Sequence, residues 1–307
     1  MYQFILIISG GMIALMVTLN GNLSQSMSLT PALVLIHLTG LMTSMLLSDK
    51  KIEKAKPVPL PYYSAGLLGI VVTLADLACV TQIGVTLTLA LKLMGQLLGS
   101  YLIDLKGIPG LPRQKPGPER LLTLLIASAG CFYMMDLISL LHWAVWLTIL
   151  AGMTQSFCSG LNAALGSQIG TFKAVKTNFA TGLIGSLLLF SVSGVALENV
   201  LSQLFATPWP ILFGGGICAV IIVSACTLSF RHVSLLTATL LLFLGQLGFG
   251  NFFDLLSGHE LNTRMILGGL IMLSGLGAEG LWVWLKQENY LAKTRRNGYS
   301  NKIENVI

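Results

Sequence analysis

The chain has 307 residues, of which 54% are hydrophobic and only 10% are charged. Soluble domains carry about 25% charged residues, so this composition excludes an ordinary soluble enzyme, and the mean hydropathy of +0.80 indicates a protein whose main solvent is the lipid bilayer. The net charge of +6 raises the question of a nucleic-acid partner, and the positions of the basic residues decide it.

Apolar segments long enough to cross a bilayer recur along the chain. A helix that rises ~1.5 Å per residue needs about 20 apolar residues to cross a ~30 Å hydrocarbon core. No basic stretch precedes the first segment, so we expect it to be an uncleaved span. Reading for such runs predicts an all-α membrane protein with ten transmembrane helices, at residues 2–22, 31–48, 62–82, 85–105, 120–136, 142–162, 177–197, 208–229, 233–253 and 264–285.

Motifs of enzymes and of metal or nucleotide sites are missing from the sequence. It contains no HExxH, no CxxC pair, no Walker loop and no GxSxG, so we expect no enzymatic activity, no cofactor and no metal. The five cysteines all fall inside apolar segments. That placement is typical of small buried residues with free thiols.

The basic residues indicate how the helices are oriented, because short loops rich in Lys and Arg stay in the cytoplasm. With the N-terminus inside, sixteen of the 18 Lys and Arg residues fall on the cytoplasmic side, while Arg264 falls outside and Lys92 within the membrane. We therefore expect both termini in the cytoplasm, with residues 287–307 as a tail. Positive charges spread over that face suit contact with anionic membrane lipids and not with nucleic acid.

The two halves of the chain resemble each other, with residues 1–138 forming one repeat and residues 139–286 the other. The matching pairs include Gly10 with Gly152 and Asn20 with Asn162 at an offset of 142, and Gln96 with Gln246 and Asp104 with Asp254 at an offset of 150. Each half holds five expected helices, an odd number, so the second half enters the membrane inverted. Inverted repeats with a site between them are a recurring plan of secondary transporters that work by alternating access.

The run from Lys92 to Asp104, KLMGQLLGSYLID, with the KGIPGLPR segment that follows it, resembles the YdcZ-like inner-membrane proteins. Asn20 with its Leu neighbours and the small-residue second helix around Gly40 carry the same resemblance. This family belongs to the drug/metabolite transporter superfamily, whose larger members have a fold of two inverted five-helix repeats. The resemblance implies an exporter of small molecules in the bacterial inner membrane. The family usually occurs as single five-helix units, so this chain departs from it in length.

Charged side chains inside the membrane need a reason to be there, because each costs ~2.5–3.5 kcal/mol near the bilayer centre. Asp76 lies eight residues before Gly84 and Lys92 lies eight residues after it. If Gly84 forms a tight turn between two helices, both groups lie ~12 Å from that turn, at equal depth. We therefore expect Asp76 and Lys92 to form an ion pair, which serves either as a structural lock or as part of a site.

Comparison of the halves separates shared polar residues from those found in one half. Asp76, Lys92 and His37 have no polar counterpart, since Cys226, Leu242 and Phe179 occupy the matching positions. The candidate substrate-binding residues are Asp76, Lys92, Gln96, His37, Asn20, Asn162 and Gln246. Each of them also has a structural reading, as a contact between helices. Asp76 and Glu279 are candidates to carry a coupled proton, because desolvated carboxyl groups in membranes serve this role.

These observations predict a secondary active transporter, an exporter of a small polar or amphipathic metabolite, active as a monomer or weak homodimer. The sequence leaves the substrate's charge open, with a preference for zwitterionic or amphipathic molecules that suit both Asp76 and Lys92. Two alternatives remain. A lipid flippase would need a cavity open sideways to lipid, and a non-transporting interaction subunit would close Asp76, Lys92 and Gln96 into one saturated network without a cavity.

Overall fold

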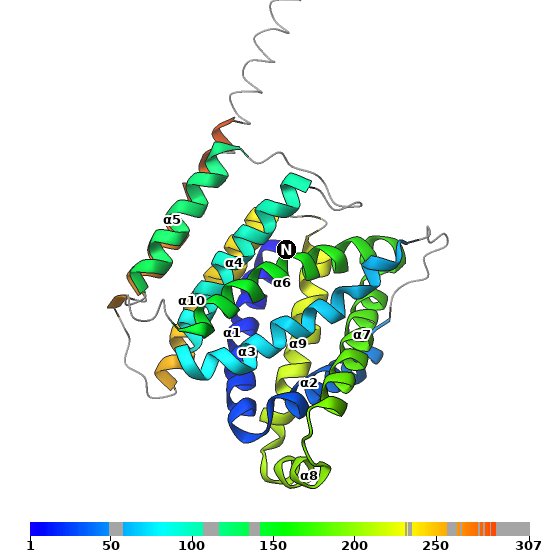
Figure 1. Cartoon of the computed structure of the whole chain (residues 1–307). Helices are drawn as coiled ribbons and strands as arrows, with labels where there is room; N and C mark the ends of the chain where they lie inside the picture. Colours follow the sequence, from blue (N-terminus) through cyan, green and yellow to red (C-terminus); the bar gives the residue numbers. More distant parts are fainter. Residues whose placement is uncertain are drawn as a thin grey trace, which may run out of the picture.

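The computed structural model describes residues 1–48, 58–106, 117–134, 142–230, 232, 235–256, 263–264, 266–275, 277–278, 280–282 and 284–286. Across these stretches the chain forms helices joined by turns, and none of the described residues is in a strand (Figure 1). The C-terminal tail and the boundary expected near residue 138 lie outside the described residues.

The helices follow one another in the order expected from the apolar segments. They are α1 (Tyr2–Ser26), α2 (Leu29–Met45), the 3-10 helix η1 (Leu60–Ser64), α3 (Ala65–Ile83), α4 (Val85–Lys106), α5 (Pro118–Met134), α6 (Trp143–Ile169), α7 (Thr171–Val192), α8 (Leu197–Ala206), α9 (Trp209–Ser229) and α10 (Leu235–Leu256). A further apolar helix covers Ile266–Lys286.

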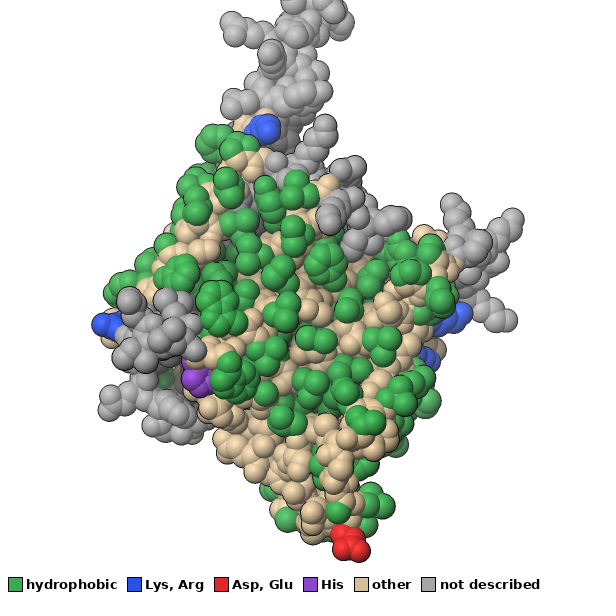
Figure 2. Space-filling model, in the orientation of Figure 1, with side chains coloured by type: hydrophobic (Ala, Val, Ile, Leu, Met, Phe, Trp, Pro, Cys, Tyr) green, Lys and Arg blue, Asp and Glu red, His purple; other side chains and the backbone are tan. Residues whose placement is uncertain are grey.

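Seven of these helices are long and apolar enough to cross a membrane, counting η1 and α3 together as Leu60–Ile83. The other three expected spans coincide with shorter apolar helices, at Leu29–Met45, Leu121–Met134 and Leu241–Phe252. Large apolar side chains cover the surface in Figure 2, where few charged groups are visible. The chain is therefore a helical, multi-pass membrane protein.

The connection between α6 and α7 is shorter than expected. A loop was expected between residues 162 and 177, but α6 continues to Ile169 and α7 begins at Thr171. Gly170 alone makes the turn, with a φ of 103° that glycine adopts without the steric cost of a side chain. Lys173 and Lys176 thus lie in the first two turns of α7 and not in a loop.

One helix was not anticipated. The span expected at residues 177–197 ends at Val192, and after Gly194, which has a φ of 71°, the short helix α8 follows. The backbone N–H of Ser28, at the α1–α2 turn, donates to the side-chain Oε1 of Gln203 on α8 at 3.3 Å. This bond holds α8 at the end of the bundle where α1 and α2 meet.

Glycines bring two pairs of helices into close backbone contact. A Cβ atom on Gly10 would meet the backbone carbonyl of Leu242, so α1 lies directly against α10. A Cβ atom on Gly152 would meet the carbonyl of Lys92 in the same way, which brings α6 against α4. Such close approach is the usual role of small residues between membrane helices. Helix α1 therefore packs closely on α10, and α6 packs closely on α4.

Helix α5 and the helix at Ile266–Lys286 lie at the edge of the bundle (Figure 1). They pack on each other, since Thr123 Oγ1 donates to the carbonyl of Gly275 at 3.1 Å. A Cβ atom on Gly130 would also meet the carbonyl of Gly268. The other helices therefore form the centre of the molecule.

Candidate functional site

A cavity of about 120 Å³ lies at the centre of the bundle. Because a water molecule needs ~10–15 Å³ of such space, the cavity has room for several waters or a small organic molecule. Its lining residues come from α1, α2, α3, α4, α6, α7, α9 and α10, with Phe230 at the end of α9. None of the described residues of α5 or of the helix at Ile266–Lys286 lines the cavity.

Asp76 and Lys92 form the expected ion pair in this cavity. Lys92 Nζ donates to Asp76 Oδ1 at 2.8 Å and to Oδ2 at 2.7 Å, and the two side chains are 3% and 5% exposed. Gly84, with a φ of 79°, turns the chain tightly between α3 and α4, which brings the two positions to the same depth. The pairing neutralises both charges.

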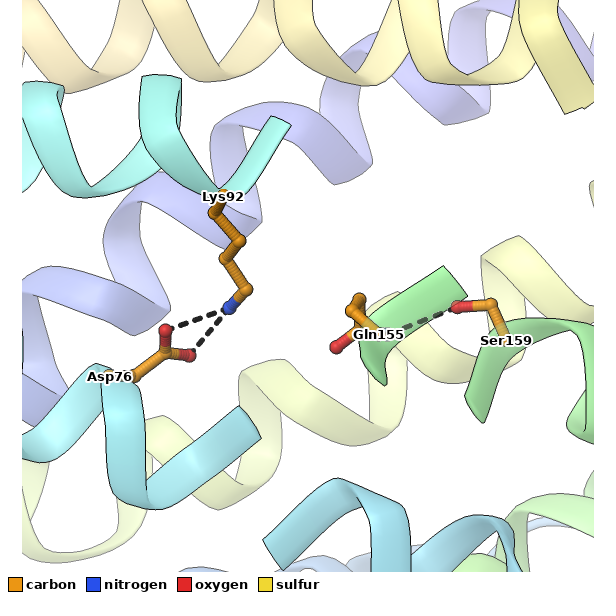
Figure 3. Close-up of polar contacts among 4 residues, drawn as sticks. All are labelled: Asp76, Lys92, Gln155 and Ser159. Carbon is orange, nitrogen blue, oxygen red and sulfur yellow. Dashed lines mark hydrogen bonds and ion pairs between the residues drawn. The ribbon is translucent and has the colours of Figure 1, made fainter. Parts of the chain in front are cut away.

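Gln155 and Ser159 on α6 lie across from the ion pair, as Figure 3 shows. Gln155 Nε2 donates to Ser159 Oγ at 3.0 Å, and both residues line the cavity. We did not identify them from the sequence. The signal was present, because the matching position of Gln155 at the offset of 142 is Ile13, the same one-sided polarity that singled out Asp76.

Asn162 lines the cavity within a small buried network. Its Nδ2 donates to Asn178 Oδ1 at 3.0 Å, and the thiol of Cys158 donates to the carbonyl of Ala65 at 3.2 Å. Among the described residues, Asn162 Oδ1 is buried without a hydrogen-bond partner. Asn178 was also missed, although Ile36 occupies its matching position.

Asn20 and His37 line the cavity from α1 and α2. Asn20 Oδ1 lies against Gly215 of α9, where a Cβ would meet it, and has no hydrogen-bond partner in the described part of the chain. His37 Nδ1 lies 2.9 Å from the carbonyl of Leu33. Since a carbonyl only accepts, Nδ1 carries the hydrogen of this bond.

The remaining sequence candidates have different outcomes. Gln96 lines the cavity, and its backbone carbonyl accepts from Ser156 Oγ at 2.8 Å. Gln246 is buried but does not line the cavity, and its backbone lies in the close contact between α10 and Gly10. The residue that matches it in the other half therefore reaches the site while Gln246 does not. Glu279 lies outside the described residues.

All five cysteines are free and buried, as expected. Cys158 and Cys226 line the cavity, whereas Cys79, Cys131 and Cys218 do not. Cys131 is fully buried in the core cluster formed around α4 and α5. The cavity thus contains two thiols and the core three.

Comparisons with known proteins agree with this architecture. The family model described as "Putative inner membrane exporter, YdcZ" matches residues 1–133 and 143–277, one stretch in each half. A solved structure titled "Crystal structure of protein" is 15% identical to this chain, covers 92% of it and 96% of its own length, and has a TM-score of 0.57. That likeness concerns the fold alone. No curated protein sequence matches the chain.

The family match covers most of the chain and fits a helical protein built around a membrane-embedded cavity. The fold, the apolar surface and the sequence of the α4 region agree with it. The chain belongs to the YdcZ family of inner-membrane exporters in the drug/metabolite transporter group.

Proposed function

We propose that the protein is a secondary active exporter of a small polar or amphipathic metabolite, and that it works by alternating access. The observation that carries the proposal is the central cavity, which helices of both halves line and which contains the buried Asp76–Lys92 pair. Rocking of one half against the other would open this cavity to each side of the membrane in turn. Without an ATP-binding motif, an ion or substrate gradient supplies the energy.

Ten spanning helices in two inverted repeats are part of this proposal. Two contacts between helices support it, Gly10 with Leu242 and Gly152 with Lys92. Gly10 matches Gly152 at the offset of 142, and Lys92 matches Leu242 at the offset of 150, so the two contacts join equivalent positions. The separate family matches in the two halves support it as well. One chain then supplies both halves of the site, so a monomer is sufficient for transport.

The ion pair favours a zwitterionic headgroup. Separating a buried pair leaves an uncompensated charge, which costs about 3–5 kcal/mol. A cation that displaced Lys92 from Asp76 would leave Lys92 unpaired, and an anion bound to Lys92 would leave Asp76 unpaired. A molecule with both an ammonium and a carboxylate group satisfies both side chains at once.

The site residues in this proposal are Asp76, Lys92, Gln96, His37, Asn20 and Asn162, with Gln155 and Asn178 added. Gln246 is left out because it does not line the cavity. A coupled proton on Asp76 would release Lys92, which is one way for a proton gradient to drive the exchange of partners. Both termini lie in the cytoplasm in this scheme, and the substrate leaves on the side of the α1–α2 turn.

The cavity argues against a non-transporting subunit, which would have Asp76, Lys92 and Gln96 in a closed network. A lipid flippase would expose its polar residues to lipid between helices. Asn20, Asp76 and Lys92 are 2%, 2% and 4% exposed, so their polar groups face the interior.

Transport by the purified chain in proteoliposomes tests the proposal. The vesicles are loaded with a panel of labelled small metabolites, including zwitterions, organic cations and organic anions, and efflux is followed with and without a pH gradient. We expect efflux of at least one zwitterion, abolished in Asp76→Asn. The proposal is contradicted if every panel member leaves the vesicles no faster than it leaves protein-free vesicles, or if efflux is unchanged in Asp76→Asn.

A further inference from the structure

The cavity has two chemically different faces. The first, which we call the polar face, comes from α3, α4 and α6 and includes Thr73, Asp76, Lys92, Gln96, Gln155 and Ser159. The second, which we call the apolar face, comes from α1, α9 and α10 and includes Ile13, Met16, Ile222, Val223, Cys226 and Leu242. Asn20, Thr227 and Thr239 are the polar members among the lining residues of α1, α9 and α10.

The helices that form each face pack on one another. Helix α6 contacts both α3 and α4, and α1 contacts both α9 and α10. Figure 3 shows the Asp76–Lys92 pair of α3 and α4 across from the Gln155–Ser159 pair of α6. The charged pair and most of the polar lining residues therefore belong to the polar face, while Asn20, His37, Asn178, Thr227 and Thr239 add single polar groups from other helices.

The two faces occupy matching positions of the two halves. Thr73, Asp76 and Lys92 match Val223, Cys226 and Leu242 at the offset of 150, and all six line the cavity. Gln155 and Cys158 match Ile13 and Met16 at the offset of 142. The backbone thus places equivalent positions around the cavity, while the side chains make one side polar and the other apolar.

We propose that the substrate is an amphiphile without net charge, whose zwitterionic headgroup binds the polar face and whose short aliphatic tail packs on the apolar face. This inference rests on the proposed transport function and narrows its substrate. The side chains of Ile13, Ile222 and Leu242 offer no hydrogen bond to a second polar end, and polar groups on the same three helices are limited to Asn20, Thr227 and Thr239 among the lining residues. A hydrocarbon tail there is removed from water at no polar cost.

Four probes separate headgroup from tail: norleucine, glycine, n-pentylamine and n-hexanoate. Relative to norleucine, glycine lacks the tail, pentylamine lacks the carboxylate and hexanoate lacks the ammonium. Binding to the full chain in lipid nanodiscs is measured by titration calorimetry. We expect norleucine to bind more than tenfold tighter than each of the others, since each methylene contributes a factor of about four and each headgroup deletion leaves one member of the ion pair uncompensated.

Variants locate the tail. Ile13→Gln gives the apolar face the residue of its matching position, so it should reduce the preference for norleucine over glycine. Ile222→Thr, which keeps the branch at Cβ and replaces the ethyl group by a hydroxyl, should do the same and covers the case in which Ile13→Gln does not fold. Ile8→Gln is the matched control, because Ile8 lies on the same helix but is 59% exposed and does not line the cavity. Its preference should equal that of the unchanged chain.

The outcomes distinguish this inference from the transport function. Equal affinity for glycine and norleucine would contradict an aliphatic tail on the substrate. Binding of pentylamine or hexanoate as tight as that of norleucine, or tighter, would contradict a zwitterionic headgroup. Either result is compatible with an exporter of another substrate. A preference unchanged in both Ile13→Gln and Ile222→Thr would show that the tail does not lie on the apolar face. If no probe binds at millimolar concentration while proteoliposomes transport another metabolite, the inference fails and the proposed function stands.

Discussion

Lys92 donates a hydrogen bond to each carboxylate oxygen of Asp76, at 2.8 and 2.7 Å, from the neighbouring helix of a hairpin that Gly84 closes. At the matching positions of the second half stand Cys226 and Leu242, which carry no charge. The second half thus provides uncharged replacements for the pair, which can be introduced as Asp76→Cys and Lys92→Leu.

Single substitutions in the pair should destabilise the protein strongly. Asp76→Cys and Lys92→Leu each leave one buried charge without its partner, and the cost of breaking such a pair is about 3–5 kcal/mol. Unfolding by sodium dodecyl sulfate, followed by tryptophan fluorescence, measures this loss.

The double variant Asp76→Cys/Lys92→Leu is the control for these two. It has no unpaired charge, so it should recover most of the stability that either single variant loses, yet bind and transport no zwitterion. A double variant as unstable as the singles would mean that the ion pair itself, and not charge balance, stabilises the hairpin.

The glycine contacts between helices should tolerate no added methyl group. In Gly10→Ala and Gly152→Ala the new Cβ would meet a backbone carbonyl, so the helices must separate, at a cost of about 1–3 kcal/mol. The same unfolding measurement applies, and the two variants should behave alike because the two contacts match.

Gly248→Ala on α10 provides the comparison. A Cβ there meets nothing within 4 Å, and alanine favours a helix by about 1 kcal/mol over glycine. Its stability should equal or exceed that of the unchanged chain. If Gly10→Ala and Gly248→Ala were equally stable, α1 and α10 would not be in backbone contact in the membrane.

Thiol labelling tests access to the cavity. Single-cysteine variants retain either Cys226, which lines the cavity, or Cys131, which is 0% exposed in the core. Methyl methanethiosulfonate, a small reagent, should label Cys226 in the folded protein and Cys131 only after denaturation. Mass spectrometry gives the extent of labelling. Equal labelling rates for the two would contradict a water-accessible cavity beside Cys226.

The orientation can be tested in whole cells with cysteines at two exposed positions. Phe205 on α8 is 90% exposed and Leu46 at the end of α2 is 85% exposed. The variants are made in a background without other cysteines. A maleimide that does not cross the inner membrane should label Phe205→Cys in cells whose outer membrane is permeabilised and whose inner membrane is intact. Leu46→Cys should be labelled only after lysis. The reverse pattern would invert the proposed topology.

Much of this architecture follows from local features of the sequence. Apolar length located the helices, and the equal spacing of Asp76 and Lys92 from Gly84 predicted their pairing, because the geometry of a helical hairpin is regular. Both predictions depend on elements that lie next to each other in the chain. The resemblance that begins at Lys92 was confirmed by the family match.

The parts that were missed depend on local turn geometry or on packing between distant helices. Gly170 makes a one-residue turn that residue type alone does not distinguish from a glycine in a longer loop. Gln155 is an ordinary polar residue until α6 is placed against α4, and Gln246 has the same sequence context as Gln96 yet does not line the cavity. Helix α8 is short and was included in a loop.

The two faces of the cavity have a consequence for how such a protein can arise. Two identical five-helix chains assembled as a dimer would repeat every lining residue, so a residue such as Gln155 on one side would impose glutamine in place of Ile13 on the other. Joining the halves in one gene removes that constraint, and each half can then diverge separately. The proposed division between headgroup and tail is therefore unavailable to a dimer of identical chains.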